Sequence, residues 1–322
     1  MVSGKSHLVM ISPATASANN GNWQTVSRWA RFLSPRYDVS IMQAWDGCRA
    51  DAMIALHARR SAGSLQAFAM SCPNRPAVLV LTGTDLYRDI HADASARDSI
   101  VAATALVVLQ ESGLGELPPA LRAKAKVIFQ SAPALPALPA RDGQFDVIMV
   151  GHLRAEKDPA TYMAAARLVS DPRVRMLHVG GALDASLDSL ARDTMRDTPR
   201  YQWLGNLPHD ETRRRVQACR LMVLTSRMEG GANVIIEAVT SGVPVLASDI
   251  SGNCGMLGEA YAGYFPVGDG AALARMIDRA ARDAAWLEEL AAQCRERARL
   301  FTPEAERAAV LQLMDNLGCR AS

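Results

Sequence analysis

The chain has 322 residues, of which 49% are hydrophobic and 21% charged, and its formal net charge is +2. This length suggests two domains, and this composition is typical of a globular protein with its own core. The nearly neutral charge argues against nucleic acid or membrane as a partner. The first residues lack the apolar stretch of a signal peptide, and no apolar run reaches about 18 residues, so we expect a cytoplasmic protein.

Short apolar runs alternate with amphipathic helical stretches along the first half of the chain. The helical stretches include residues 23–33 and 94–103. The apolar runs predict strands at residues 7–11, 39–42, 53–56, 77–81, 106–109 and 127–129. Strands that alternate with helices predict a parallel sheet with helices on both faces.

A proline-rich segment at residues 131–144 interrupts this alternation. Its prolines recur at every third position, which suits a stiff extended linker. Strands are predicted again at residues 146–150, 175–179, 221–224 and 243–247, and a final helix at 303–317 has Pro303 at its first position. The chain is therefore predicted to be α/β, with two doubly wound parallel-sheet domains at residues 1–140 and 141–302.

The most informative segment follows the predicted strand 221–224 and combines a glycine-rich turn with the start of a short helix. Its candidate residues are Glu229, Gly230, Gly231, Ala232, Asn233 and Glu237. Open α/β sheets bind ligands at the carboxyl ends of their strands, and a helix start offers free N–H groups to a diphosphate. Two carboxylates that flank such a site suit the hydroxyls at the two ends of a nucleotide sugar.

A second loop follows the predicted strand 146–150 and carries Gly151, Arg154 and Lys157. Lys157 is the only lysine after residue 126. Two fixed cations can offset the charge that develops on a leaving nucleoside diphosphate. The alternative is a solvated charge cluster that also includes Glu156. No His, Asp and Cys set has metal-ligand spacing, so we expect neither a metal nor another cofactor.

Three polar segments of the first half follow predicted strands and could bind an anionic acceptor. Threonine hydroxyls and an arginine fork donate hydrogen bonds to anions, and a glycine permits a tight turn. Asp85 is either a helix N-cap or a catalytic group, and His57 either contacts an acceptor or is a buried histidine. The candidate acceptor residues are Asn20, Gly21, Asn22, His57, Thr82, Gly83, Thr84, Asp85 and Arg88.

The two segments of the second half resemble the retaining glycosyltransferases of the GT-B fold, which have two Rossmann-like domains that face a cleft. The resemblance rests on the Glu-x7-Glu spacing at 229–237 and on the loop 151–159. It implies that the first domain binds the acceptor and the second the UDP-sugar donor. It also implies that the C-terminal helix, residues 303–322, packs back on the first domain.

The same resemblance implies roles for individual residues of the donor site. Glu229 would contact the donor sugar and Glu237 the ribose, while the loop around Leu204 would hold the nucleobase. Lys157 occupies the position of the family's lysine. The family's common arginine position is held by His152 in this chain, and Arg154 is the expected substitute.

A closer resemblance is to the selenosugar synthases (the SenB family) of selenoneine biosynthesis. It rests on residues 19–25, 81–89, 150–159 and 226–234. It implies that selenophosphate receives the sugar of a UDP-sugar such as UDP-N-acetylglucosamine, with release of UDP and phosphate and without a metal. Only small-molecule partners are implied, and the oligomeric state is not predicted.

Two alternatives remain open from the sequence. One is a conventional glycosyltransferase that acts on a hydroxyl of a lipid, glycan or natural product. The other is a UDP-sugar-binding protein without catalytic activity. The low aromatic content, 5%, argues mildly against a lipid or long glycan acceptor.

Overall fold

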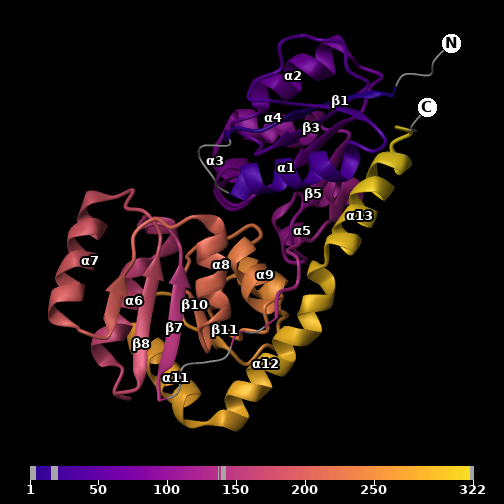
Figure 1. Cartoon of the computed structure of the whole chain (residues 1–322). Coiled ribbons are helices and arrows are strands. Elements are labelled where there is room, and N and C mark those ends of the chain that lie inside the picture. The colour runs from indigo at the N-terminus through magenta and orange to yellow at the C-terminus, as the bar shows by residue number, and fades with distance from the viewer. Residues whose placement is uncertain (1–4, 16–20, 137, 139–142, 320–322) are drawn as a thin grey trace. The chain divides into compact units, whose positions relative to one another are not determined.

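The computed structural model describes residues 5–15, 21–136, 138 and 143–319 (Figure 1). The chain divides into two compact units. Unit 1 consists of Met1–Ser131 with Pro303–Ser322, and unit 2 of Ala132–Thr302. The division between the units lies at Ser131, whereas the sequence analysis placed it at residue 140.

Unit 1 is built on one parallel sheet with the strand order β2-β1-β3-β4-β5-β6. Its strands are β1 (His7–Ile11), β2 (Asp38–Met42), β3 (Ala52–Leu56), β4 (Ala77–Val80), β5 (Ala105–Val108) and β6 (Ala125–Val127). Its helices and helical turns are α1 (Gly21–Leu33), α2 (Ala62–Ser71), η2 (Asp85–Asp89), α3 (Ile90–Ala92), α4 (Ala94–Ala102), α5 (Gly113–Glu116), η3 (Pro119–Lys124) and α13 (Pro303–Asn316).

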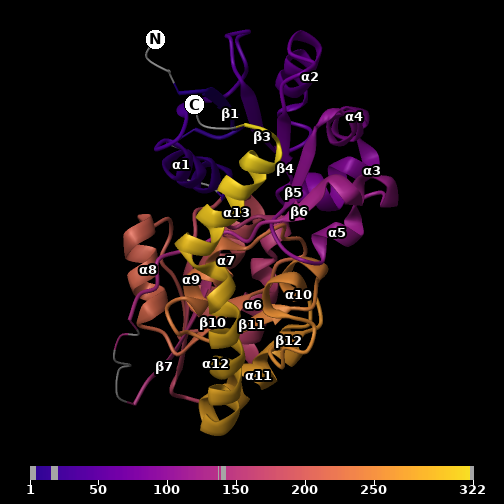
Figure 2. The ribbon, with the colours of Figure 1, turned by 90° about the vertical axis from the view of Figure 1, so that its right-hand side faces the viewer.

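Helices cover both faces of this sheet, which explains why its inner strands β1, β3, β4 and β5 are almost entirely buried and apolar. Leu65 and Phe68 of α2 pack with Ile100 of α4 in one core cluster. Trp29 of α1 and Val310 of α13 pack in the other cluster. Figure 2 shows α13 alongside α1.

A buried carboxylate of α13 forms several hydrogen bonds to the rest of unit 1. Glu306 is 1% exposed. It accepts hydrogen bonds from Arg28 Nε at 2.6 Å, Arg28 Nη2 at 3.0 Å, Trp29 Nε1 at 2.7 Å and the Ser131 hydroxyl. A buried charge persists only when its lone pairs are satisfied in this way.

Unit 2 repeats the plan with the strand order β12-β11-β10-β7-β8-β9. Its strands are β7 (Phe145–Val150), β8 (Val174–Val179), β9 (Tyr201–Trp203), β10 (Leu221–Leu224), β11 (Val245–Ser248) and β12 (Tyr264–Phe265). Its helices and helical turns are η4 (Ala155–Lys157), α6 (Pro159–Leu168), α7 (Ala185–Asp197), α8 (His209–Gln217), α9 (Asn233–Val239), α10 (Ser251–Leu257), α11 (Gly270–Arg282), α12 (Ala284–Ala298) and η5 (Arg299–Phe301).

Every strand pair in the two sheets is parallel, so the predicted doubly wound α/β class is confirmed. Strand order reverses between β1 and β3 in unit 1 and between β7 and β10 in unit 2. Such reversal points are where open α/β sheets bind ligands. The loops after β3, β7 and β10 therefore lie where this fold class binds ligands.

The strands that differ from the sequence prediction lie toward the edges of the sheets. β9 and β12 were not predicted, because two or three residues give no readable apolar run. β6 covers Ala125–Val127 instead of 127–129, and β11 begins at Val245 because the preceding Pro244 lacks an N–H group for a strand ladder.

Candidate functional site

The loop between β10 and α9 holds Glu229 in a defined orientation. Glu229 is 8% exposed, and its Oε1 accepts hydrogen bonds from the Ser226 hydroxyl at 2.6 Å and from Lys157 Nζ. The other carboxylate oxygen, Oε2, accepts none from the described residues. The carboxylate is thus fixed through one oxygen and can accept a ligand hydroxyl with the other.

The loop between β7 and α6 lies directly against this loop. Thr225 donates its hydroxyl to Lys157 O at 2.8 Å, and Arg227 N donates to Glu156 O at 2.9 Å. Arg227 also pairs with Asp158 at 2.8 Å. These contacts bring Lys157 of one loop beside Glu229 of the other, at the reversal point of the sheet.

The cations of the β7 loop differ in how they are held. Lys157 Nζ pairs with Glu229, and an ammonium group has two further protons to donate. Arg154 is exposed and makes no side-chain hydrogen bond or ion pair with a described residue. Both groups can therefore donate to an anion placed over this loop.

His152 occupies the position after Gly151 and has a structural contact. Its Nδ1 accepts a hydrogen bond from Gly181 N at 3.0 Å. Burial lowers its pKa below the usual value, and the charges of Arg154 and Lys157 lower the pKa further. His152 is accordingly neutral near pH 7 and ties the loop after β7 to the loop after β8.

Two glycines are required for these loops to approach one another. A Cβ on Gly252 would lie 1.9 Å from the backbone oxygen of Glu229. A Cβ on Gly180, which has a φ of +153°, would lie 2.0 Å from the backbone oxygen of Gly151. Side chains at these positions would displace the loops that carry Glu229 and Lys157.

Helix α9 places the second glutamate of the predicted motif. Ala232 is its N-cap, Asn233 its first residue, and Gly230 and Gly231 precede it, as predicted. The Glu237 side chain is 12% exposed and accepts a hydrogen bond from His209 Nε2 at 2.7 Å. The contact between His209 and Glu237 was not predicted from the sequence, because no local pattern shows that α8 packs against α9.

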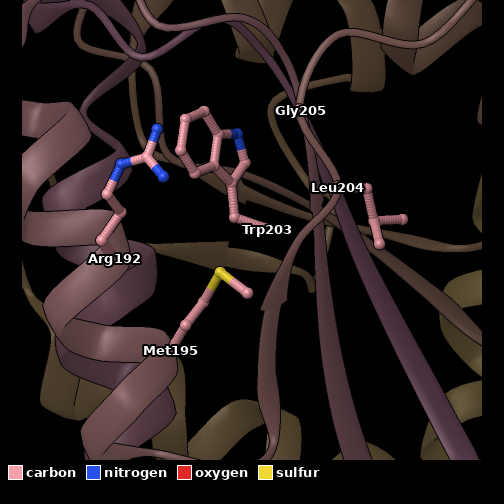
Figure 3. A pocket seen from close by; sticks show the side chains of 5 residues that line it. All are labelled: Arg192, Met195, Trp203, Leu204 and Gly205. Atoms are coloured by element: carbon pink, nitrogen blue, oxygen red, sulfur yellow. The ribbon is translucent and has the colours of Figure 1, made fainter.

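The loop after β9, predicted to hold a nucleobase, borders an open pocket of about 440 Å³. Arg192 and Met195 of α7 line it together with Trp203, Leu204 and Gly205 (Figure 3). Trp203 Nε1 donates to Gly180 O at 2.8 Å, and Leu204 N donates to His178 O at 2.8 Å. These bonds fix the backbone around Leu204 at the end of the sheet.

Most of the candidate acceptor residues of unit 1 lie together after β3 and β4, where His57 and Asp85 are buried. His57 has a positive φ of 73° and is 2% exposed. Its Nε2 lies 3.2 Å from the Thr84 hydroxyl and 4.0 Å from Asp89 Oδ2. Burial lowers the pKa of His57, so the ring is neutral near pH 7.

Asp85 ties two loops of unit 1 together. Its Oδ1 accepts hydrogen bonds from Thr82 N and the Thr82 hydroxyl at 2.9 and 2.8 Å, and its Oδ2 accepts one from Ala58 N at 2.9 Å. Asp85 is fully buried. It therefore orders the turn that contains Gly83 and Thr84.

Asp89 was not singled out from the sequence, yet two arginines converge on it. Arg59 Nε lies 3.1 Å from Asp89 Oδ2, and Arg88 Nε donates to Asp89 Oδ1 at 3.0 Å. The side chains of Arg59 and Arg88 remain 44% and 49% exposed. The cluster therefore combines two half-exposed arginine side chains with the buried Asp89 and His57.

The remaining acceptor candidates lie after β1. Gly21 begins α1 and its carbonyl accepts the Thr25 hydroxyl at 2.8 Å, and Asn22 is half-buried in the first turn. Asn20 lies outside the described residues. Within those residues, no group of three or more His, Cys, Asp or Glu could hold a metal ion, and no helix is long and apolar enough to cross a membrane.

Comparison with known protein families identifies this arrangement. The family model described as glycosyl transferases group 1 matches residues 134–301, which is more than half of the chain. The chain belongs to this glycosyltransferase family. The matched segment contains Glu229, Glu237, Arg154 and Lys157.

Solved glycosyltransferases share the fold of the whole chain. Sucrose-phosphate synthase from Thermosynechococcus elongatus superposes with a TM-score of 0.79 at 19% identity, over 98% of this chain and 99% of that one. HepE of Anabaena, solved with UDP and glucose, gives 0.73 at 15% identity, over 97% and 100%. The lipopolysaccharide outer core galactosyltransferase WaaB gives 0.73 at 12% identity, over 96% and 99%. These matches confirm the predicted GT-B fold.

Proposed function

We propose that this glycosyltransferase is a selenosugar synthase. It transfers the sugar of a UDP-sugar, for which UDP-N-acetylglucosamine is the expected donor, to the selenium of selenophosphate. The main support for the donor half of the proposal is the Glu229–Lys157 pair, which lies at the reversal point of the second sheet. This pairing leaves one oxygen of the Glu229 carboxylate and two protons of the Lys157 ammonium group available to a ligand. Solved relatives of the same fold contain UDP or UDP-glucose.

The donor would be held at its sugar and at its diphosphate. Glu229 Oε2 accepts a sugar hydroxyl, and Lys157 and Arg154 donate to the phosphate oxygens. In the transition state these cations stabilise the negative charge that builds up on the departing UDP. An ammonium and a guanidinium in this position can replace a metal ion in that role.

The acceptor half of the proposal rests on the polar cluster of unit 1 and on the resemblance to selenosugar synthases. The side chains of Arg59 and Arg88, which both contact Asp89, are half-exposed, and guanidinium groups suit the phosphoryl oxygens of selenophosphate. A selenium anion is a strong nucleophile, so the neutral His57 is not needed as a base.

The reaction balances in two steps. Selenium forms a bond to the anomeric carbon while the bond from that carbon to the UDP oxygen breaks, and UDP leaves with the electron pair. Water then adds to phosphorus, the phosphorus–selenium electron pair returns to selenium, and a proton from water yields the selenol and phosphate. The second step is not assigned to a residue.

Mass spectrometry of the protein incubated with UDP-N-acetylglucosamine tests the proposal. We expect a selenium-bearing hexosamine and UDP only when selenophosphate is present. Lys157→Ala and Glu229→Gln should abolish the product, whereas Lys126→Ala, which changes an exposed lysine of unit 1, should not. Donor cleavage with a hydroxyl acceptor but not with selenophosphate would overturn the proposal in favour of a conventional glycosyltransferase.

A further inference from the structure

Helix α8 supplies a partner for the glutamate that faces the ribose end of the proposed donor site. His209, the first residue of α8, lies with Nε2 2.7 Å from Glu237 Oε1. The His209 side chain is 41% exposed and that of Glu237 12% exposed. The second oxygen of Glu237, Oε2, accepts no hydrogen bond from the residues that the structure describes.

A second cation of α8 lies one turn further along the same face. Arg213 is 8% exposed, donates from Nη2 to Pro133 O at 3.0 Å, and has an Nε without a hydrogen-bond partner in the described part of the chain. Burial lowers the pKa of Arg213, whereas the Glu237 carboxylate, and then Asp210, raise it. Glu237 therefore sits in the field of two basic side chains from one helix.

The electrostatics of His209 agree with a direct ion pair. The hydrogen bond to Glu237 raises the pKa of His209 above its usual value, although burial and the nearby Arg213 act in the opposite direction. Asp210 also faces the ring, at 3.8 Å from Nδ1. The imidazole is thus held as a donor toward Glu237.

This geometry leaves the Glu237 carboxylate with one anchored and one available oxygen. A free glutamate side chain rotates about its terminal bonds and loses that freedom when it binds a ligand. A carboxylate that is already anchored through Oε1 loses less conformational entropy when a ligand binds, and it presents Oε2 in a fixed direction. Glu229 is anchored in the same manner by Ser226 and Lys157.

We propose that His209 is a positioning residue that fixes Glu237 for the ribose hydroxyls of the nucleoside diphosphate donor, and so makes the site select ribonucleotides. This inference rests on the proposed donor chemistry. It does not depend on whether the acceptor is selenophosphate or a hydroxyl. His209 itself touches Glu237 and not the sugar.

Calorimetric binding of UDP, 2′-deoxy-UDP and 3′-deoxy-UDP tests the inference. A hydroxyl bonded to a charged group contributes enough for a roughly 10-fold difference in affinity. We expect wild-type protein to bind UDP at least ~10-fold more tightly than one of the deoxy analogues. His209→Ala and Glu237→Gln should reduce that preference to within ~3-fold, mainly by weakening UDP binding.

Two further variants separate positioning from a structural role. His209→Gln retains an N–H donor near Nε2 and should restore the preference for UDP. Arg214→Ala, which changes an exposed residue of the same helix, should leave it unchanged. Thermal unfolding temperatures of the α8 variants should differ by only a few degrees, because a hydrogen bond to a partly exposed histidine contributes only modestly to stability.

The outcomes distinguish this inference from the proposed function. If wild-type protein binds UDP with a ribose preference that His209→Ala preserves, the inference is wrong and the donor assignment stands. If wild-type protein does not bind UDP or UDP-sugars at all, the proposed function fails, and the inference fails with it.

Discussion

Replacing Glu306 with alanine should destabilise unit 1 without touching either candidate site. The Glu306 carboxylate is buried between α13 and α1 and accepts hydrogen bonds from Arg28, Trp29 and Ser131. Removing it leaves the Arg28 guanidinium, whose side chain is only 12% exposed, without its counter-ion. It also leaves the indole N–H of the fully buried Trp29 without an acceptor.

The magnitude follows from these contacts. Breaking a buried ion pair by deleting one partner costs about 3–5 kcal/mol, and this value already includes the penalty of the stranded charge. In a unit of roughly 150 residues, each kcal/mol lowers the melting temperature by about 2–4 °C. Glu306→Ala should therefore lower the melting temperature of unit 1 by about 6–20 °C.

Differential scanning calorimetry and hydrogen exchange together provide the assay. In Glu306→Ala, the calorimetric transition that shifts to lower temperature should be the one in which α1 and α13 lose their protection from hydrogen exchange. The double variant Arg28→Ala with Glu306→Ala should lose less than the sum of the single variants, since it leaves no stranded charge. Glu304→Ala, an exposed change on the same helix, should cost less than about 1 kcal/mol. A loss below about 1 kcal/mol for Glu306→Ala would refute the reasoning.

Three further predictions concern unit 2. Gly252→Ala should weaken UDP binding ~10-fold or more in calorimetry, because the new Cβ would overlap the backbone of Glu229, and wild-type affinity would contradict this. Lys157→Met should lower UDP release from a UDP-sugar by roughly 10²–10³-fold, as expected for one lost charge contact in the transition state, and an unchanged rate would remove it from the mechanism. His178 is fully buried, and burial lowers its pKa to about 4. Unfolded chains take up this proton near pH 6.5 and the folded protein only near pH 4, so stability should fall by about 3 kcal/mol as the pH drops between these values. Urea unfolding of wild type and His178→Gln over this range should show the difference, and equal pH profiles would count against it.

The local part of the candidate site in unit 2 could be predicted from the sequence because it is a continuous strand, turn and helix. Glu229 and Glu237 lie where the spacing placed them, before and within α9. The fold class was readable for the same reason, since buried parallel strands are unbroken apolar runs. The edge strands β9 and β12 were not, because they are too short for a pattern to stand out.

The partners of these residues could not be predicted, because they come from distant parts of the chain. Ser226 and Lys157 both donate to one oxygen of Glu229, and His209 of α8 donates to Glu237 of α9. No local sequence pattern predicts such contacts, because they depend on how the loops and helices pack. Asp89 is a further case, because only the helical turn η2 brings it beneath Arg59 and His57.

The return of α13 to unit 1 reverses the order in which the two halves of the molecule can finish folding. Synthesis proceeds from the N-terminus, and domains ordinarily become complete in that order. Unit 2 is one continuous stretch, whereas unit 1 must wait for Pro303–Asn316 to emerge from the ribosome. Until then the apolar face of α1 around Trp29 lacks its cover, and Arg28 lacks its counter-ion. Unit 1 is thus synthesised first but completed last. Until α13 has been synthesised, unit 1 is the part of the chain that needs protection from aggregation.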